Sequence, residues 1–214
     1  MSRCVVFGAA YSVYVRIARL ALEEKRVPYR LEEIDVFAEG GPPANYLARH
    51  PFGRIPAFEH DGFGLYETAA IARYVDEAFD GPALQPHEAK ARARMNQIVS
   101  ILDNYAYPAL VWDIFVERVR APTTNRKADE TRIAAALPKA RRVLGALGDL
   151  ADEGQWLCGG MLTLADLYAA PMICYFRMAR EGREMLAEFP RLEGWWRRMA
   201  ARPSVAATRS PFEA

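Results

Sequence analysis

Three polar side chains stand where predicted strands lead into predicted helices: Ser12 early in the chain, and Glu67 with Thr68 further on. A helix N-terminus has unpaired backbone N–H groups and the positive end of the helix dipole, so it attracts negative charge. A serine hydroxyl at such a position can hold a thiolate or a phosphate, and the Glu67–Thr68 helix start can also receive an anion. The same residues also fit ordinary helix capping, so the sequence alone leaves both interpretations open.

A proline interrupts the strand that precedes the second of these helix starts. Pro56 lies between Ile55 and Ala57 in a run that turns back through Asp61-Gly62, a strong hairpin signal. Because proline cannot donate to a sheet ladder, it belongs at strand edges, at bulges or after a cis peptide bond. We therefore expect strand pairing to end at Ile55, which leaves its N–H and C=O open to an extended peptide held between the two helix starts.

Other kinds of site receive little support from the sequence. The first helix start lacks the glycine patterns of nucleotide-binding loops. The chain has 28 basic and 27 acidic side chains, a net charge of +1, which disfavours a dedicated nucleic-acid binder. The three cysteines lack metal-binding spacing, so we expect no metal. The three histidines fit no protease triad. No segment approaches the ~20 apolar residues of a membrane span, so we expect a soluble protein without membrane partners. The cysteines predict no disulfide framework, which indicates the cytoplasm, and the balanced charge predicts no nucleic-acid partner.

Hydrophobic periodicity divides the chain into two parts. Residues 1–80 follow the order β-α-β, short helical turn, β-hairpin, helix, which predicts an α/β domain whose first two strands are parallel. The predicted strands cover residues 3–8, 28–36, 55–59 and 63–66, and the predicted helices cover 12–25, 44–49 and 68–79.

A segment with glycine and prolines at 81–87 predicts a linker, and residues 88–214 are expected to form an all-helical bundle. The predicted helices cover residues 88–119, interrupted by Pro108, then 129–150, 164–180 and 192–201. Thr163 and Asp166 fit a capping box at the start of the third helix. We therefore expect Asp166 to support folding rather than catalysis.

Three stretches, in this order, resemble the cytosolic glutathione transferases, most closely the serine-type phi/theta-like and related bacterial members. They are SVYVRIARLALEEK, HPFGRIPAFEHDGFGLYETAAIARYV and LTLADL. The set of P-F-G-x-I-P, Glu-Thr and T-x-A-D-L motifs covers almost the whole chain in order and spacing. The resemblance implies a thioredoxin-like N-terminal domain, an all-helical C-terminal domain, a homodimer and glutathione as co-substrate.

The resemblance also implies a role for each candidate residue. Ser12 matches the hydroxyl that hydrogen-bonds the glutathione sulfur. Pro56 matches the family's cis-proline, and Ile55 matches the residue whose backbone pairs with the cysteinyl part of glutathione. Glu67 and Thr68 match the pair that holds the γ-glutamyl amine and carboxylate. Free thiols have a pKa of about 8.5, which a helix N-terminus lowers, so the implied reaction is attack by bound thiolate on an electrophilic carbon.

Two features of the sequence depart from the family pattern. Where phi-like members carry basic residues for the glycyl carboxylate, this chain has GGPP at 40–43, and Arg54 is our candidate substitute. Tyr11 lies beside Ser12, and tyrosine-type transferases use a phenol for the same task. Because their tyrosine lies on the first strand, Ser12 is our first choice as the catalytic residue and Tyr11 the second.

A hydrophobic electrophile is expected to bind between the domains, with Tyr11, Tyr105, Trp112 and Phe115 as candidate walls. Core packing at helical spacing explains the last three at least as well. The function implied is a glutathione S-transferase acting on hydrophobic electrophiles in detoxification. Two alternatives stay open: a glutathione-dependent isomerase, dehalogenase or peroxidase on the same fold, and a non-catalytic ligand-binding protein.

Overall fold

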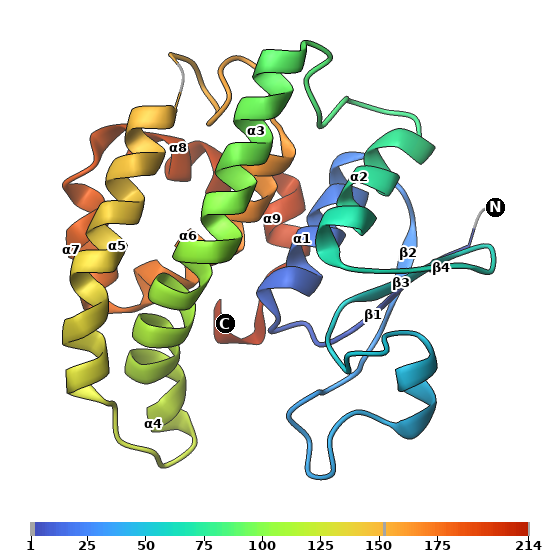
Figure 1. The fold of residues 1–214 in the computed structure, drawn as a ribbon, viewed down its shortest axis with the longest axis horizontal. Helices are drawn as coiled ribbons and strands as arrows, with labels where there is room; N and C mark the ends of the chain where they lie inside the picture. Colours follow the sequence, from blue (N-terminus) through green and yellow to red (C-terminus); the bar gives the residue numbers. More distant parts are fainter. Residues whose placement is uncertain (1–2, 152, 214) are drawn as a thin grey trace. The chain divides into compact units, whose positions relative to one another are not determined.

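The computed structural model describes residues 3–151 and 153–213 and divides the chain into two compact units. The first unit contains the chain up to Leu84 together with the segment from Arg202 onward. The second unit runs from Gln85 to Ala201. Figure 1 shows the sheet and its helices in blue to teal, and the helices of the second unit mainly in green to orange.

A four-stranded mixed sheet forms the centre of the first unit, in the order β2-β1-β3-β4 (Figure 1). The strands are β1 (Cys4–Phe7), β2 (Tyr29–Glu32), β3 (Ala57–His60) and β4 (Phe63–Tyr66). Helix α1 (Val13–Glu24) connects the parallel pair β1 and β2, as the sequence predicts, and β3 and β4 form the predicted antiparallel hairpin. Strand β3 begins at Ala57, two residues later than predicted, because Pro56 has no N–H to donate to the ladder.

Strand β1 is buried on both faces. Val5 and Phe7 pack with Tyr46, from the short helix η1 (Ala44–Ala48), and with Ala57. Cys4 and Val6 alternate to the other face and are also buried. Helices α1 and α2 (Thr68–Ala78) contact each other. A strand held on both faces fixes the point at which the chain turns toward Ser12.

The end of the chain packs on α1, which differs from the predicted domain boundary. We expected the helical domain to include residues 88–214, but α9 (Pro203–Ala207) and η3 (Pro211–Glu213) belong to the first unit. The buried guanidinium of Arg16 donates to both carboxylate oxygens of Glu213, at 2.5 and 3.2 Å, and to the carbonyl of Val205 at 3.2 Å. A buried charge requires such partners, so the tail returns to α1.

The second unit is helical, as predicted. It contains α3 (Ala89–Ile101), η2 (Leu102–Arg120), α4 (Ala121–Thr123), α5 (Glu130–Leu150), α6 (Leu164–Met178), α7 (Arg180–Ala187) and α8 (Pro190–Ala200). Helix α6 is central: it is buried from Leu164 to Phe176 and contacts α3, η2, α7 and α8. The sequence did not predict α7, which an extended Ala179 separates from α6.

None of the helices in the described part of the chain has the length and apolar character needed to cross a membrane.

The interruption predicted at Pro108 takes the form of a wider helical segment. η2 is a π-helix, continuous with α3, and the N–H of Ala121 after it bonds to the carbonyl of Val116, five residues back. In an α-helix, proline lacks the N–H and its ring clashes with the carbonyl four residues earlier. A wider turn relieves this clash without breaking the helix.

The capping box predicted at Thr163 and Asp166 is confirmed, and both residues are fully buried. One carboxylate oxygen of Asp166 accepts from the N–H of Leu157 at 2.9 Å and from Nε1 of Trp195 at 2.8 Å. The other accepts from the N–H of Thr163 at 2.8 Å. A single carboxylate therefore connects the loop before α6, the start of α6 and the middle of α8.

Replacing Asp166 with asparagine should lower the free energy of unfolding by about 3 kcal/mol, because the amide turns an N–H2 group toward buried donors. Urea unfolding followed by circular dichroism measures this loss. Asp149→Asn, at an exposed position on α5, is the matched control and should have almost no effect. Equal losses in the two variants would contradict the structural role of Asp166.

Candidate functional site

Ser12 is the N-cap residue of α1. Its hydroxyl oxygen accepts a hydrogen bond from the N–H of Val15 at 3.4 Å, which is ordinary capping. Capping uses a lone pair of the oxygen, and the hydroxyl proton has no acceptor among the residues that the structure describes. The half-buried hydroxyl can therefore donate to an anion while it caps the helix, so the two interpretations of Ser12 are compatible.

Tyr11, the second choice for the catalytic residue, already uses its phenolic proton. Its hydroxyl donates to Oδ1 of Asp35 at 2.6 Å, and its ring stacks on Phe37 with 6.2 Å between the centroids. A phenol whose proton is donated to a carboxylate cannot donate the same proton to a thiolate. The geometry of this turn therefore favours Ser12.

Ile55 leaves its backbone open, as the sequence predicts. The Ile55–Pro56 peptide bond is cis, and the pairing of β1 with β3 reaches only as far as Phe7 and Ala57. Neither the N–H nor the C=O of Ile55 has a backbone partner within the described part of the chain. The Ile55 side chain packs against the core that contains Tyr46, which holds these backbone groups in place.

Glu67 and Thr68 begin α2 in an unusual backbone conformation. Glu67, rather than Thr68, is the N-cap residue, and its φ of 71° lies in the left-handed region that non-glycine residues rarely adopt. Such strain costs on the order of 1–3 kcal/mol, and strained residues cluster at functional sites. The first backbone hydrogen bond joins the N–H of Ile71 to the carbonyl of Glu67. The preceding N–H groups of α2, from Thr68 to Ala70, have no backbone acceptor among the described residues.

Arg54, the candidate substitute for a missing basic residue, has an exposed side chain. Its carbonyl accepts a hydrogen bond from the Tyr46 hydroxyl at 2.7 Å, which anchors its backbone. Its guanidinium makes no hydrogen bond to any residue that the structure describes. A basic side chain directly before Ile55 is therefore available to a carboxylate.

The residues expected to line the electrophile pocket have different environments. Tyr11 belongs to the first unit, and the other three lie on η2 of the second. Tyr105 is 64% exposed and Trp112 is half-buried, with its ring 6.3 Å from that of Tyr107. Phe115 is buried and stacks on Tyr175 at 4.2 Å between the centroids, so core packing accounts for its side chain.

His50 is a candidate residue that the sequence did not single out. Its side chain is buried, and its Nδ1 atom has no hydrogen-bonding partner among the described residues. Its ring centroid lies 5.0 Å from that of Tyr66. Burial lowers the pKa of His50, Glu67 acts to raise it and Arg54 to lower it further. In the sequence His50 lies in a turn without a Cys or Ser pattern. Its place directly before the P-F-G motif is the one signal that could have identified it.

The lowered pKa of His50 predicts a pH-dependent stability. Because the folded pKa lies below the ordinary 6.5, the unfolded chain binds more protons than the folded one just below that pH. The preferential protonation of His50 in the unfolded chain should therefore lower the free energy of unfolding as the pH falls below about 6.5. His50→Asn removes it, so wild type should lose stability relative to the variant between about pH 7.5 and 5.5 in urea unfolding.

His87→Asn, at an exposed position, is the matched control for the His50 experiment. The carboxylates that titrate at lower pH are the same in all three proteins, so their contribution cancels in each difference. A wild-type advantage over His50→Asn that does not change with pH would contradict the assignment.

Comparison with known proteins agrees with the thioredoxin-like sheet and helical bundle described above. Residues 6–83 match the family model of the glutathione S-transferase N-terminal domain, and residues 85–203 match that of the C-terminal domain. Together these matches cover nearly the whole chain. The chain therefore belongs to the glutathione S-transferase family.

Within this family the chain is similar to plant enzymes. It is 30% identical over 201 residues to glutathione S-transferase 4 of Zea mays, covering 94% of this chain and 89% of that protein. It is 28% identical to the probable glutathione S-transferase GSTF1 of Oryza sativa subsp. japonica, covering 96% and 94%. The crystal structure of glutathione transferase F7 from Populus trichocarpa is 26% identical, with a TM-score of 0.84 and coverage of 96% and 97%. The chain is thus a phi-like glutathione S-transferase enzyme.

Proposed function

We propose that this glutathione S-transferase transfers the thiolate of glutathione to small hydrophobic electrophiles, with Ser12 as the residue that stabilises the thiolate. The observation that carries the proposal is the Ser12 hydroxyl, whose oxygen caps α1 and whose proton has no acceptor in the described part of the chain. The hydroxyl proton and the helix dipole both favour the charged form of the sulfur, so they lower the pKa of the thiol. More thiolate at neutral pH means faster conjugation.

The peptide of glutathione is held by groups that the fold leaves unpaired. The N–H and C=O of Ile55 pair with the cysteinyl backbone in the manner of a short strand. At the N-terminus of α2, Thr68 and the first N–H groups receive the γ-glutamyl carboxylate, and the exposed Glu67 receives the ammonium group. Arg54 receives the glycyl carboxylate. The opposite effects of Glu67 and Arg54 on the pKa of the buried His50 fit charges placed near this ring.

The conjugation itself is a nucleophilic attack by sulfur on carbon. A sulfur lone pair forms the new S–C bond, and the leaving group departs with the electron pair of the bond that breaks. Binding both reactants in one site replaces a bimolecular encounter by an oriented one, which lowers the barrier further. Ser12 donates a hydrogen bond throughout and forms no covalent bond to the substrate.

Ser12→Ala should lower kcat/KM toward chlorodinitrobenzene at about pH 6.5 by roughly 10- to 100-fold, because the thiolate loses a donor. The pH profile of kcat/KM should also shift to higher pH, since the thiol of bound glutathione ionises less readily. Tyr11→Phe is the matched control and should keep most of the activity. If Ser12→Ala retained full activity while Tyr11→Phe lost it, the catalytic assignment would pass to Tyr11.

Two alternative functions, one catalytic and one not, would use the same site. A glutathione-dependent isomerase, dehalogenase or peroxidase would use the same thiolate with another acceptor, and a non-catalytic protein would bind glutathione without turnover. One solved structure at 25% identity and a TM-score of 0.84, glutathione S-transferase I of maize, is a complex with an atrazine glutathione conjugate. That complex favours conjugation. Assays with chlorodinitrobenzene, haloalkanes, cis-enones and hydroperoxides separate these activities.

We also propose that the protein acts as a homodimer in the cytoplasm, where it detoxifies such electrophiles. The first unit exposes several large apolar side chains: Leu47, Phe52, Phe63 and Tyr66, of which Phe52 is the most exposed at 70%. The rings of Phe52 and Tyr66 contact each other at 6.2 Å between the centroids. Exposed apolar groups that adjoin one another are typical of protein–protein contacts, and a second copy of the chain is the partner that the family suggests.

Sedimentation at micromolar concentration should give twice the chain mass of 24.1 kDa. Phe52→Ser should raise the dimer dissociation constant by about tenfold or more, since a truncated aromatic anchor removes buried apolar area. Tyr105→Ser, at an exposed aromatic of the second unit, is the control and should leave association unchanged. A monomeric wild-type protein would rule out this proposal.

A further inference from the structure

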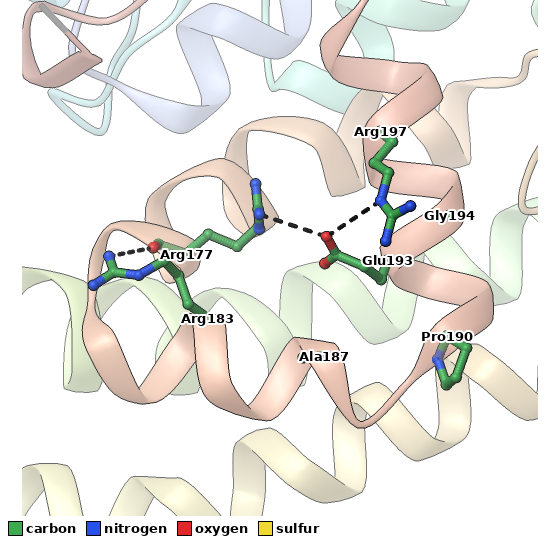
Figure 2. Close-up of a pocket in the computed structure, with 7 residues that line it drawn as sticks. All are labelled: Arg177, Arg183, Ala187, Pro190, Glu193, Gly194 and Arg197. Atoms are coloured by element: carbon green, nitrogen blue, oxygen red, sulfur yellow. Dashed lines mark hydrogen bonds and ion pairs between the residues drawn. The ribbon is translucent and has the colours of Figure 1, made fainter.

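A charged hollow lies within the second unit, and none of the proposed glutathione contacts belongs to it (Figure 2). It has a volume of about 600 Å³ and is bordered by α6, α7 and α8. Its charged lining consists of Arg177, Arg183, Arg197 and Glu193. A hollow of this size accommodates a small organic molecule.

The arginines of this hollow have unused hydrogen-bond donors. Figure 2 shows Arg177 and Arg197 approaching the Glu193 carboxylate from opposite sides, at 3.6 and 3.7 Å. These separations are longer than a hydrogen bond, so the ion pairs leave guanidinium N–H groups available. The Nε atom of Arg177 is buried and has no partner among the described residues. Arg183 donates from one nitrogen to the carbonyls of Arg177 and Met178 at 3.1 and 3.0 Å.

The charge of the hollow is not balanced by its own residues. Three guanidinium groups and one carboxylate give a net charge of +2. The N-terminus of α8 adds positive potential at the same place, because its first residue, Pro190, also lines the hollow. No side chain caps α8, and the N–H groups of Arg191 and Leu192 have no backbone acceptor in the described chain.

Small residues keep the hollow open. Ala187, Pro190 and Gly194 complete its lining. A Cβ atom at Gly194 would meet only Nη1 of Arg198, at an ordinary contact distance of 3.6 Å, so packing does not require a glycine there. Glycine in a helix interior is less stable than alanine. The absence of a side chain at Gly194 therefore leaves room beside the arginines and lowers the stability of α8.

We propose that this hollow binds a small phosphate monoester. The two negative charges of a phosphate dianion match the net charge of +2, whereas a carboxylate balances only half of it. The three terminal oxygens of the phosphate can accept from several guanidinium groups at once, and the planar fork of arginine suits this geometry. Bound phosphate would connect the end of α6 with α7 and α8.

Titration calorimetry of the full chain with glycerol 2-phosphate tests this proposal. At about 0.15 M salt and without glutathione, we expect a dissociation constant of about 1 mM or lower. Arg177→Gln and Arg197→Gln should each weaken binding by about tenfold. Glu193→Gln should tighten it several-fold, because a like charge leaves the site. Because glutathione is absent, the result does not depend on the proposed transferase mechanism.

Arg142→Gln is the matched control, since it removes the same charge from an exposed position on α5 outside the hollow. It should leave the affinity unchanged. Three outcomes would overturn the proposal: no binding of glycerol 2-phosphate by wild type, equal weakening by Arg142→Gln and Arg177→Gln, or succinate binding at least as tightly. Circular dichroism confirms that each variant is folded, and Glu193→Gln tests the site without removing an arginine.

Discussion

Backbone groups that regular structure cannot pair mark the places where we propose that the first unit binds glutathione. A helix leaves its first N–H groups without partners, and a strand that meets a proline ends its ladder. In the first unit these interruptions occur before α1, before β3 and before α2. Each adjoins a buried strand or core side chain that holds it in place. The proposed glutathione site therefore combines unpaired main-chain groups at Ile55 and at the start of α2 with the side chains of Ser12, Glu67, Thr68 and Arg54.

Local chemistry made much of this architecture predictable. Ser12 before a periodic helix and Pro56 inside an apolar run are signals that lie within a few residues of the features they produce. The hairpin at Asp61-Gly62 and the capping box at Thr163 are of the same kind. Helical spacing cannot distinguish an exposed Tyr105 from a buried Phe115, so the sequence did not separate pocket residues from core residues on η2.

The features that the sequence did not reveal depend on distant parts of the chain or on subtle breaks. The partner of Arg16 lies 197 residues further along, which no local pattern can show. The unpartnered Nδ1 belongs to the buried His50, whose ring lies 6.2 Å from that of Phe52 and 5.0 Å from that of Tyr66, contacts that no local pattern shows. Helix α7 was missed since Ala179 breaks the helix without a proline or glycine at the break. The left-handed backbone of Glu67 likewise occurs at a residue type that rarely adopts it.

The pairing of Arg16 with Glu213 has a consequence for how the chain is made. In connectivity, residues 85–201 are an insertion between two parts of one structural unit. A ribosome synthesises Glu213 197 residues after Arg16, so the nascent first unit lacks the partner of this buried charge until the helical unit has been made. Premature termination anywhere in the helical unit would leave a guanidinium in the core without its carboxylate. A chain that stops before Glu213 therefore keeps an unpaired buried charge in its first unit, which lowers its stability and raises the fraction that is unfolded.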